Sequence, residues 1–280
     1  MKPAKISVLA PGLMGGSVAL ACARAFPDST LFVWSRKKES LPRIQKALPK
    51  AKTGTEVSGA AGSDIVVLGA PAPVLADLVR SLLPHLGAQT LVTDVASVKG
   101  PVEKELARLL KGRARWIGSH PMAGSEEGGF SAARADLFQN AAVILTPSQS
   151  TPAQTIRDAS DFWKFLGGRV VELTPEEHDR QVSRISHLPH AVAATLVRAA
   201  GQKGLPLAGP GYRDTTRVAA GPSSMWTEIL LGNREEILAG LKEFRNQLQD
   251  LEKALENRDG VALTKFLEDA VKIRGSLPNP

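Results

Sequence analysis

The hydrophobic positions in the first half of the chain form short apolar runs, separated by longer stretches in which apolar and polar residues alternate with helical spacing. The runs are rich in Val, Ile, Leu and Trp, as buried strands are, and cover residues 5–9, 31–35, 64–70, 90–95, 115–119 and 141–147. Residues 74–83 and 102–110 have the pattern of amphipathic helices. Strands alternating with helices predict right-handed crossovers and a doubly wound, mostly parallel α/β sheet.

The pattern changes after residue 147. The Ser/Thr/Pro-rich stretch SQSTP is followed by one further helix and strand, at 153–166 and 169–173, and then by a nearly all-helical remainder. The long helical segments are predicted at 175–200, 233–256 and 259–273. We therefore expect two domains, an α/β domain over 1–148 and a helical domain over 149–280, as a chain of 280 residues allows.

The N-terminal segment admits two interpretations. Residues 6–23 are uncharged and follow two lysines, which resembles a secretory signal peptide. Pro11 and the glycines after it would interrupt such a segment, whereas a strand at 6–9, a turn and a helix at 13–26 accommodate them. The longest other apolar run, 65–76, is too short to cross a bilayer and contains two prolines. We predict a cytoplasmic protein with no membrane partner.

Composition and charge narrow the class of protein. With 43% apolar and 22% charged residues the chain is globular, and its one cysteine, Cys22, excludes a disulfide framework. The net charge of +7 lies entirely in 1–148, with 18 basic and 11 acidic residues, while 149–280 has 17 of each. This charge suits nucleic acid, an anionic membrane or a small anion. Aromatic residues for base stacking are scarce, at 5%, so no nucleic-acid partner is predicted.

A glycine-rich turn follows the first predicted strand. Residues 10–17 read APGLMGGS, where the dinucleotide fingerprint has G-x-G-x-x-G between a strand and a helix. Gly12 takes the place of the second glycine, which lets the backbone approach a pyrophosphate, and Ala10 replaces the first. A turn that serves packing alone is the alternative. We predict a Rossmann-type domain whose cofactor contacts are Gly12, Leu13, Met14, Gly15 and, at the end of the 64–70 strand, Ala70.

The end of the second predicted strand bears on the choice of cofactor. NAD-binding proteins place a carboxylate there for the ribose 2′-hydroxyl. Here Trp34 is followed by Ser35, Arg36 and Lys37, and the first carboxylate is at residue 39. A hydroxyl with two cations would instead bind a 2′-phosphate. We predict NADP rather than NAD, held by Ser35, Arg36 and Lys37; the alternative is a solvated basic loop.

Two groups of segments are unusually rich in His, Ser, Arg and Glu, the residue types that can act in catalysis or bind a substrate. TDVASVK at 93–99 and GSHPMAGSE at 118–126 both begin at the ends of predicted strands, where open α/β sheets bind ligands. The second group is SHLPH at 186–190, RDTTR at 213–217 and the pair Met225 and Trp226.

Over nearly its whole length the sequence resembles the prephenate/arogenate dehydrogenase family of tyrosine biosynthesis. The phrases GSHPMAGSE, ADLF, ILTP, SHLPHAVA and RDTTR carry the resemblance. It implies oxidative decarboxylation of prephenate to 4-hydroxyphenylpyruvate, in which hydride leaves ring C4 for the nicotinamide of NADP and the ring carboxylate departs as CO2. It also implies that the helical domain forms a homodimer.

The resemblance assigns roles to individual residues. His120 is the expected catalytic histidine, which hydrogen-bonds the C4 hydroxyl and takes its proton, and imidazole suits this role with its ordinary pKa of about 6.5. Ser97 is expected to orient His120 and the substrate hydroxyl. Arg217 is the expected anchor for a substrate carboxylate, and His190 a second substrate ligand.

Further residues have supporting roles in this scheme. His187 is a further expected substrate contact; it lies three residues before His190, so on a helix both face the same way. Glu126 resembles a residue that gates the pocket, with a plain surface carboxylate as the alternative. His178 and Asp179 are expected just behind the substrate contacts. A zinc site of His120, His187 and His190 has enough ligands, but hydride transfer needs no metal, so none is predicted.

The substrate is left open by the sequence. Relatives often carry an acidic residue in a phrase like SDPxMW after the anchoring arginine, and residues 218–226 contain none. A carboxylate would favour the ammonium group of arogenate, so its absence favours prephenate, whereas the NADP signature is common among arogenate-using relatives. Alternatives are another two-domain NADP dehydrogenase, such as a β-hydroxyacid dehydrogenase or imine reductase, with a lysine in the catalytic role, and a non-catalytic NADP sensor.

Overall fold

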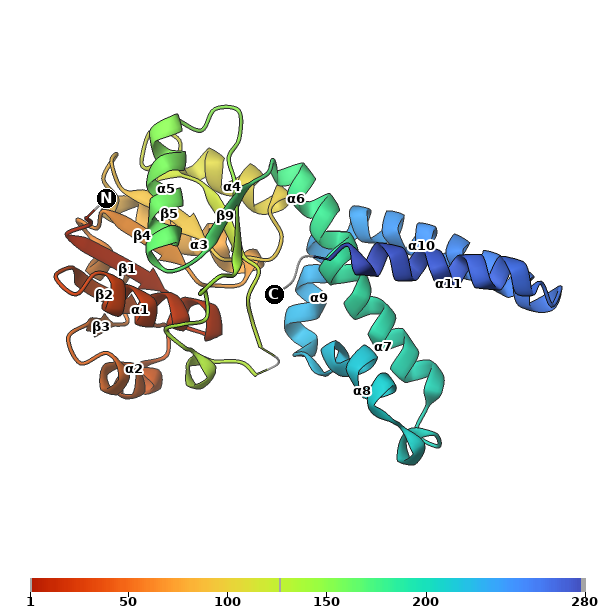
Figure 1. The fold of residues 1–280 in the computed structure, drawn as a ribbon. Coiled ribbons are helices and arrows are strands. Elements are labelled where there is room, and N and C mark those ends of the chain that lie inside the picture. The colour runs from red at the N-terminus through yellow and green to blue at the C-terminus, as the bar shows by residue number, and fades with distance from the viewer. Residues whose placement is uncertain (1, 126, 278–280) are drawn as a thin grey trace. The chain divides into compact units, whose positions relative to one another are not determined.

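The computed structural model describes residues 2–125 and 127–277 (Figure 1). Within this part of the chain, contacts divide the molecule into two units, one ending at Asn233 and the other beginning at Arg234. The predicted domain boundary after residue 148 stays a prediction.

The main sheet of the first unit consists of six parallel strands. In chain order they are β1 (Lys5–Leu9), β2 (Thr30–Trp34), β3 (Lys52–Gly54), β4 (Ile65–Leu68), β5 (Leu91–Asp94) and β6 (Arg115–Trp116). Their spatial order is β3-β2-β1-β4-β5-β6, and every pairing is parallel. The predicted doubly wound sheet is confirmed. Its order reverses between β1 and β4, and such a switch point is where open sheets of this kind bind ligands.

Helices cover both faces of this sheet (Figure 1). They are α1 (Leu13–Ala25), α2 (Leu41–Ala47), α3 (Ala72–Leu82), α4 (Gly100–Leu110) and α5 (Ala153–Phe165). Successive side chains of a strand point to opposite faces, so Ile65 and Val67 join a core cluster with α1 and α5, while Val66 and Leu68 join another with α3 and α4. The fully apolar β4 is thus buried on both sides.

A second, smaller sheet departs from the expected pattern. The single strand predicted at 115–119 is two strands, because the chain leaves the main sheet after β6 and continues as β7 (Gly118–Pro121). β7 pairs antiparallel with β8 (Ala142–Thr146), which pairs parallel with β9 (Arg169–Glu172). The backbone of Ser119 is held by the side chains of Asp94 and Lys99 at the break.

The rest of the first unit is helical. Its elements are α6 (Pro175–Val182), the π-helical turn η5 (Ser183–His187), α7 (Leu188–Ala200), α8 (Pro210–Thr216), the 3-10 turn η7 (Arg217–Ala220) and α9 (Ser223–Gly232). The helix predicted over 175–200 is confirmed in extent, but its middle is wider than an α-helix. Pro189 lacks an N–H and crowds the carbonyl four residues earlier, and in η5 the N–H of Leu188 donates to Ser183, five residues back.

The second unit contains helices α10 (Arg234–Glu256) and α11 (Gly260–Gly275), close to the predicted bounds. Asp259 begins α11 by accepting a hydrogen bond from the N–H of Ala262, at 2.9 Å. Apolar side chains left exposed within this unit include Leu238, Leu248, Leu255, Val261, Leu267, Val271 and Ile273. In the described ranges, no helix combines the length and apolar character needed to cross a membrane.

Candidate active site

The turn after β1 has the shape of a cradle that a phosphate group would fit. Ala10 adopts a left-handed backbone (φ 65°), and its carbonyl accepts the N–H of Gly12 at 2.9 Å. A Cβ on Gly15 would lie 2.5 Å from the oxygen of Ala10, so only glycine fits the crossing of helix and strand. A Cβ on Gly12 would meet nothing within 4 Å. Gly12 therefore leaves open space in front of α1.

The surroundings of this cradle suit a dinucleotide pyrophosphate. The first turn of α1 has no acidic residue and no side-chain cap, so its N–H groups are available to an anion. Leu13 and Met14, in that turn, are half-buried. Ala70 is buried just after β4, the strand beside β1 at the switch point. These residues fit the cofactor that the fingerprint predicts.

The loop after β2 carries the residues predicted to select NADP. Ser35 is buried, and its Oγ accepts the N–H of Lys37 at 3.2 Å and hydrogen-bonds Ser40 Oγ at 2.7 Å. Arg36 and Lys37 are exposed. The Ser35 hydroxyl therefore shapes the loop, and the two cations extend from it into solvent.

His120 lies on β7 and is the start of a chain of hydrogen bonds. Its Nδ1 is 2.8 Å from Nε2 of His178, and Nδ1 of His178 is 2.8 Å from Oδ1 of Asp179. The two helix residues come from α6, and His178 lies 58 positions after His120 in the sequence. All three residues are buried, with His120 7% exposed. His178 and Asp179 thus lie directly behind His120, as predicted for them in general terms.

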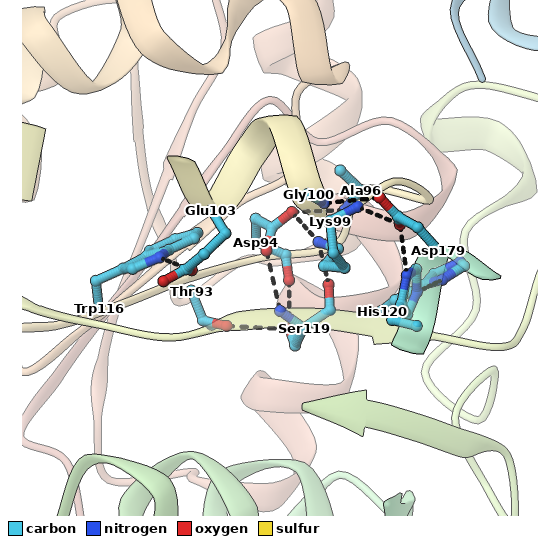
Figure 2. A network of polar contacts seen from close by, with 11 residues as sticks. Thr93, Asp94, Ala96, Lys99, Gly100, Glu103, Trp116, Ser119, His120 and Asp179 are labelled. Carbon is cyan, nitrogen blue, oxygen red and sulfur yellow. Dashed lines mark hydrogen bonds and ion pairs between the residues drawn. The ribbon is translucent and has the colours of Figure 1, made fainter. Parts of the chain in front are cut away.

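Asp179 also fixes the loop that follows β5. Its Oδ1 accepts the N–H of Lys99 and its Oδ2 that of Gly100, both at 2.8 Å, at the N-terminus of α4 (Figure 2). A carboxylate is favoured at such a helix start. One side chain thereby joins α6 to α4 and holds the loop that contains Ser97.

A buried ion pair holds the strand of His120 in place (Figure 2). Lys99 Nζ contacts Asp94 Oδ2 and donates to the carbonyl of Ser119 at 2.8 Å. Asp94 Oδ1 accepts the N–H of Ser119 at 3.0 Å. Both backbone groups of the residue before His120 are therefore bonded to charged side chains, which are among the stronger hydrogen-bond partners.

Burial and hydrogen bonding determine the protonation states of His120, His178 and Asp179. Burial lowers the pKa of His120 well below its usual value of 6.5, and repulsion from His178 and Lys99 lowers it further. Burial also lowers the pKa of His178, against the opposing effect of Asp179. Although burial alone would raise the pKa of Asp179, hydrogen bonds from His178 and two backbone N–H groups lower it. At neutral pH, Asp179 is an anion and both imidazoles are neutral.

A second histidine pair lies on the helices. His190 stacks on the indole of Trp226, with ring centroids 3.5 Å apart and planes at 11°, and it hydrogen-bonds the backbone of Val218. His187 meets the edge of the same indole at 6.3 Å. Asn233 Nδ2 donates to the carbonyl of Asp179 at 2.7 Å and lies 3.2 Å from His187 Nδ1.

His187 and His190 each have a ring nitrogen without a hydrogen-bond partner among the described residues. Nε2 of His187 and Nδ1 of His190 are buried and have no hydrogen-bond partner among the described residues. Buried polar groups in native proteins are nearly always bonded, so these two atoms are candidates to contact a ligand. Arg217 directly precedes Val218, which places its backbone beside His190, and its side chain is exposed.

One expected contact, between Ser97 and His120, differs from the prediction, and one expected site residue is not described. Ser97 is half-buried and makes no hydrogen bond to His120; in the described part of the chain His178 takes that place. Ser97 remains a predicted contact of the substrate hydroxyl. Glu126 lies outside the described residues.

Sequence reasoning missed Lys99, Asp94 and Asn233 as parts of the site. A buried lysine and aspartate five residues apart at the end of an apolar strand are a signal, since lone buried charges are rare. Asn233 has no comparable signal, because its partners are 46 and 54 positions away. Among the residues described, no group of three His, Cys, Asp or Glu side chains is placed to hold a metal ion.

Comparison with known proteins places the chain in a family. The model of the prephenate dehydrogenase nucleotide-binding domain matches residues 18–172, and that of the prephenate dehydrogenase dimerization domain matches 174–269. Prephenate dehydrogenase of Bacillus subtilis is 33% identical over 95% of this chain and 74% of its own length. Cyclohexadienyl dehydrogenase of Zymomonas mobilis is 32% identical over 97% and 95%.

Two solved structures are similar in fold over almost the whole chain. Prephenate dehydrogenase from A. aeolicus, in complex with hydroxyphenyl propionate and NAD+, superimposes with a TM-score of 0.90 at 28% identity, covering 98% of both chains. Arogenate dehydrogenase of Synechocystis gives a TM-score of 0.85 at 30% identity, covering 97% of this chain and 99% of its own. With the dinucleotide cradle, the buried histidine chain and these matches, the chain belongs to the prephenate dehydrogenase family.

Proposed function

We propose that this protein catalyses the NADP-dependent oxidative decarboxylation of prephenate to 4-hydroxyphenylpyruvate. The observation that carries the proposal is the buried, neutral His120 in the GSHP segment, in the same compact unit as the dinucleotide cradle. A neutral imidazole can take a proton, which the oxidation of a hydroxyl requires. The relatives' names support the same reaction.

In this reaction His120 acts as the base, and Arg217, His187 and His190 bind the substrate. Nε2 of His120 accepts the proton of the C4 hydroxyl as the C4 carbonyl forms. The C4 hydride passes to the bound nicotinamide, and loss of the ring carboxylate as CO2 leaves an aromatic ring. Arg217 binds a substrate carboxylate, for which its guanidinium is suited, and His187 and His190 offer the polar atoms left without partners in the described structure.

NADP preference rests on the loop after β2. No carboxylate follows Trp34 at the position that NAD-binding domains use, while Arg36 and Lys37 are exposed there. No carboxylate at that position would repel the 2′-phosphate of NADP, and the side chains of Arg36 and Lys37 can reach this phosphate. The A. aeolicus structure contains NAD+, so the preference is assigned to this chain from its own residues.

Arogenate is the second candidate substrate. Synechocystis arogenate dehydrogenase and the Zymomonas cyclohexadienyl enzyme are both similar over almost the whole chain. Residues 218–226 contain no carboxylate to pair with the ammonium group of arogenate, so prephenate is the preferred substrate. We further propose a cytoplasmic homodimer, in keeping with the dimerization-domain match and the exposed apolar side chains of α10 and α11.

Steady-state kinetics with prephenate and arogenate, each with NADP and NAD, test the proposal. The highest kcat/KM is expected for prephenate with NADP. His120→Asn should lower kcat by two or more orders of magnitude with little change in KM, and Arg217→Ala should mainly raise KM. A His120→Asn enzyme within about threefold of wild type, a loss under ~1 kcal/mol, would contradict the assignment of His120.

A further inference from the structure

The chain His120–His178–Asp179 fixes the positions of hydrogens as well as of rings. Each of its two links is 2.8 Å long, and Nε2 of His120 has no hydrogen-bond partner in the described part of the chain. The other three imidazole nitrogens of His120 and His178 all take part in these two hydrogen bonds. The direction of donation along it can be worked out from its anionic end.

Asp179 determines that direction. Its two oxygens accept hydrogen bonds from the backbone N–H groups of Lys99 and Gly100, and a backbone N–H can only donate. With these bonds and the N-terminus of α4 the group is a carboxylate, which can only accept. Nδ1 of His178 must therefore carry a hydrogen and donate it to Asp179.

The second link follows from the first. A neutral His178 with a hydrogen on Nδ1 has a lone pair on Nε2, because a neutral imidazole carries one N–H. That lone pair can only accept, so Nδ1 of His120 is the donor. Nε2 of His120, the nitrogen without a partner, is then left with a lone pair.

We propose that Asp179 and His178 are positioning residues that hold His120 as its Nδ1–H tautomer, leaving Nε2 ready to accept the substrate proton. They also offset the positive charge that His120 gains: the imidazolium donates through Nδ1 to His178, which is itself polarised by the Asp179 anion. No proton needs to leave His120 during this step. The role in turnover rests on the proposed function; the tautomer itself does not.

The surroundings of His120 explain why such an offset is needed. Burial and the nearby cation of Lys99 both disfavour a positive charge on His120. Asp94 is paired with Lys99, so its charge is already compensated. Asp179 is the remaining anion that is bonded into the chain leading to His120.

NMR of nitrogen-labelled histidine in the whole protein tests the tautomer without any substrate. Wild type should show His120 protonated at Nδ1 and bare at Nε2, assigned by loss of the signals in His120→Asn. His178→Leu removes the acceptor, and a hydrogen should then appear on Nε2 in part of the molecules. His85→Leu is the matched control and should leave the His120 signals unchanged. An Nε2–H tautomer in wild type would overturn the proposal, whatever the enzyme turns over.

Kinetics on prephenate with NADP test the consequence. His178→Gln can still accept from His120 and donate to Asp179 through its amide, whereas His178→Leu can do neither. We expect kcat to fall at least 100-fold in His178→Leu and to be at least tenfold higher in His178→Gln than in His178→Leu. KM should stay within about threefold in both. Equal kcat in the two variants would overturn a positioning role.

Asp179→Asn tests the charge. Loss of the anion makes His120 a weaker base, so the acid limb of the kcat–pH profile should move to lower pH while the plateau falls at least tenfold. Asp77→Asn, at an exposed site on α3, is the control and should leave the profile unchanged. A purely structural role predicts a lower unfolding temperature with an unmoved acid limb, and that result would overturn the proposal. If Asp179→Asn does not fold, the two His178 variants decide.

Discussion

Lys99 and Asp94 form an ion pair that is closed to solvent on both sides, with side-chain exposures of 1% and 0%. The pair lies between the end of β5 and the start of α4, and through Ser119 it fixes the backbone next to His120. Burial lowers the pKa of Lys99, although Asp94 acts in the opposite direction. The pair therefore links the stability of the fold to the position of His120.

Breaking this pair on one side should be costly. Lys99→Met leaves the Asp94 carboxylate buried and unpaired, which should lower the free energy of unfolding by about 3–5 kcal/mol, measured by urea denaturation. The double variant Lys99→Met/Asp94→Asn should lose less than the single one. Arg80→Met breaks exposed pairs and should cost under ~1 kcal/mol. A Lys99→Met protein as stable as Arg80→Met would contradict the structural role.

The two glycines of the turn after β1 should respond differently to alanine. Gly12→Ala fills the space in front of α1 but meets no atom within 4 Å, so cofactor affinity should fall at least tenfold while stability holds. Gly15→Ala brings a Cβ to 2.5 Å from the Ala10 oxygen and should destabilise the fold. Calorimetric NADP binding and thermal unfolding separate the effects, with Gly260→Ala as control. Full NADP affinity in Gly12→Ala would place the pyrophosphate elsewhere.

Cofactor preference should move with one substitution. In Ser35→Asp the new carboxylate can keep the hydrogen bond from the Lys37 N–H while adding a negative charge at the end of β2. The ratio of kcat/KM for NADP to that for NAD should drop at least tenfold. Ser81→Asp adds the same charge on α3 and should leave the ratio alone. An unchanged ratio in Ser35→Asp would show that the 2′-phosphate does not approach this loop.

Stability should fall in mild acid because of His187. Burial lowers its pKa from 6.5 to about 4, so between these pH values the unfolded chain binds more protons than the folded one. The neutral His187 contributes about 3 kcal/mol to the free energy of unfolding. This contribution is complete above pH 6.5 and is lost as the pH falls towards 4. Urea denaturation at pH 7.5 and 4.5 should show a smaller pH difference for His187→Asn than for wild type. His85→Asn should keep the wild-type difference, and an equal difference in His187→Asn would refute the assignment.

Features encoded locally were predictable from the sequence. The strands of the main sheet follow from apolar runs such as β4, and the cradle follows from the glycines placed directly after β1. The helices of the second unit follow from their periodicity and, for α11, from the Asp259 cap. In each case the determining residues lie within one turn or one strand.

Features that depend on distant partners were not predictable in detail. The break between β6 and β7 occurs where the side chains of Asp94, at the end of β5, and Lys99, in the loop after it, hydrogen-bond the backbone of Ser119. The expected partner of His120 was Ser97, whereas the structure provides His178 from another element. A pattern read along one chain contains no direct record of such pairings, which tertiary packing decides.

The π-turn η5 has a consequence for the angular positions of the histidines. At 100° per residue, an unbroken α-helix would set His178 and His190 about 120° apart around its axis. The one extra residue accommodated in a π-turn reduces this to about 20°, and brings His187 from about 180° to about 80°. The turn thus acts as a rotational offset, so that an imidazole before it and one after it face the same side. Straightening the turn into an α-helix at the same length would set His178 and His190 about 120° apart, whereas deleting one residue from 183–186 would remove the need for the turn and keep the angle near 20°.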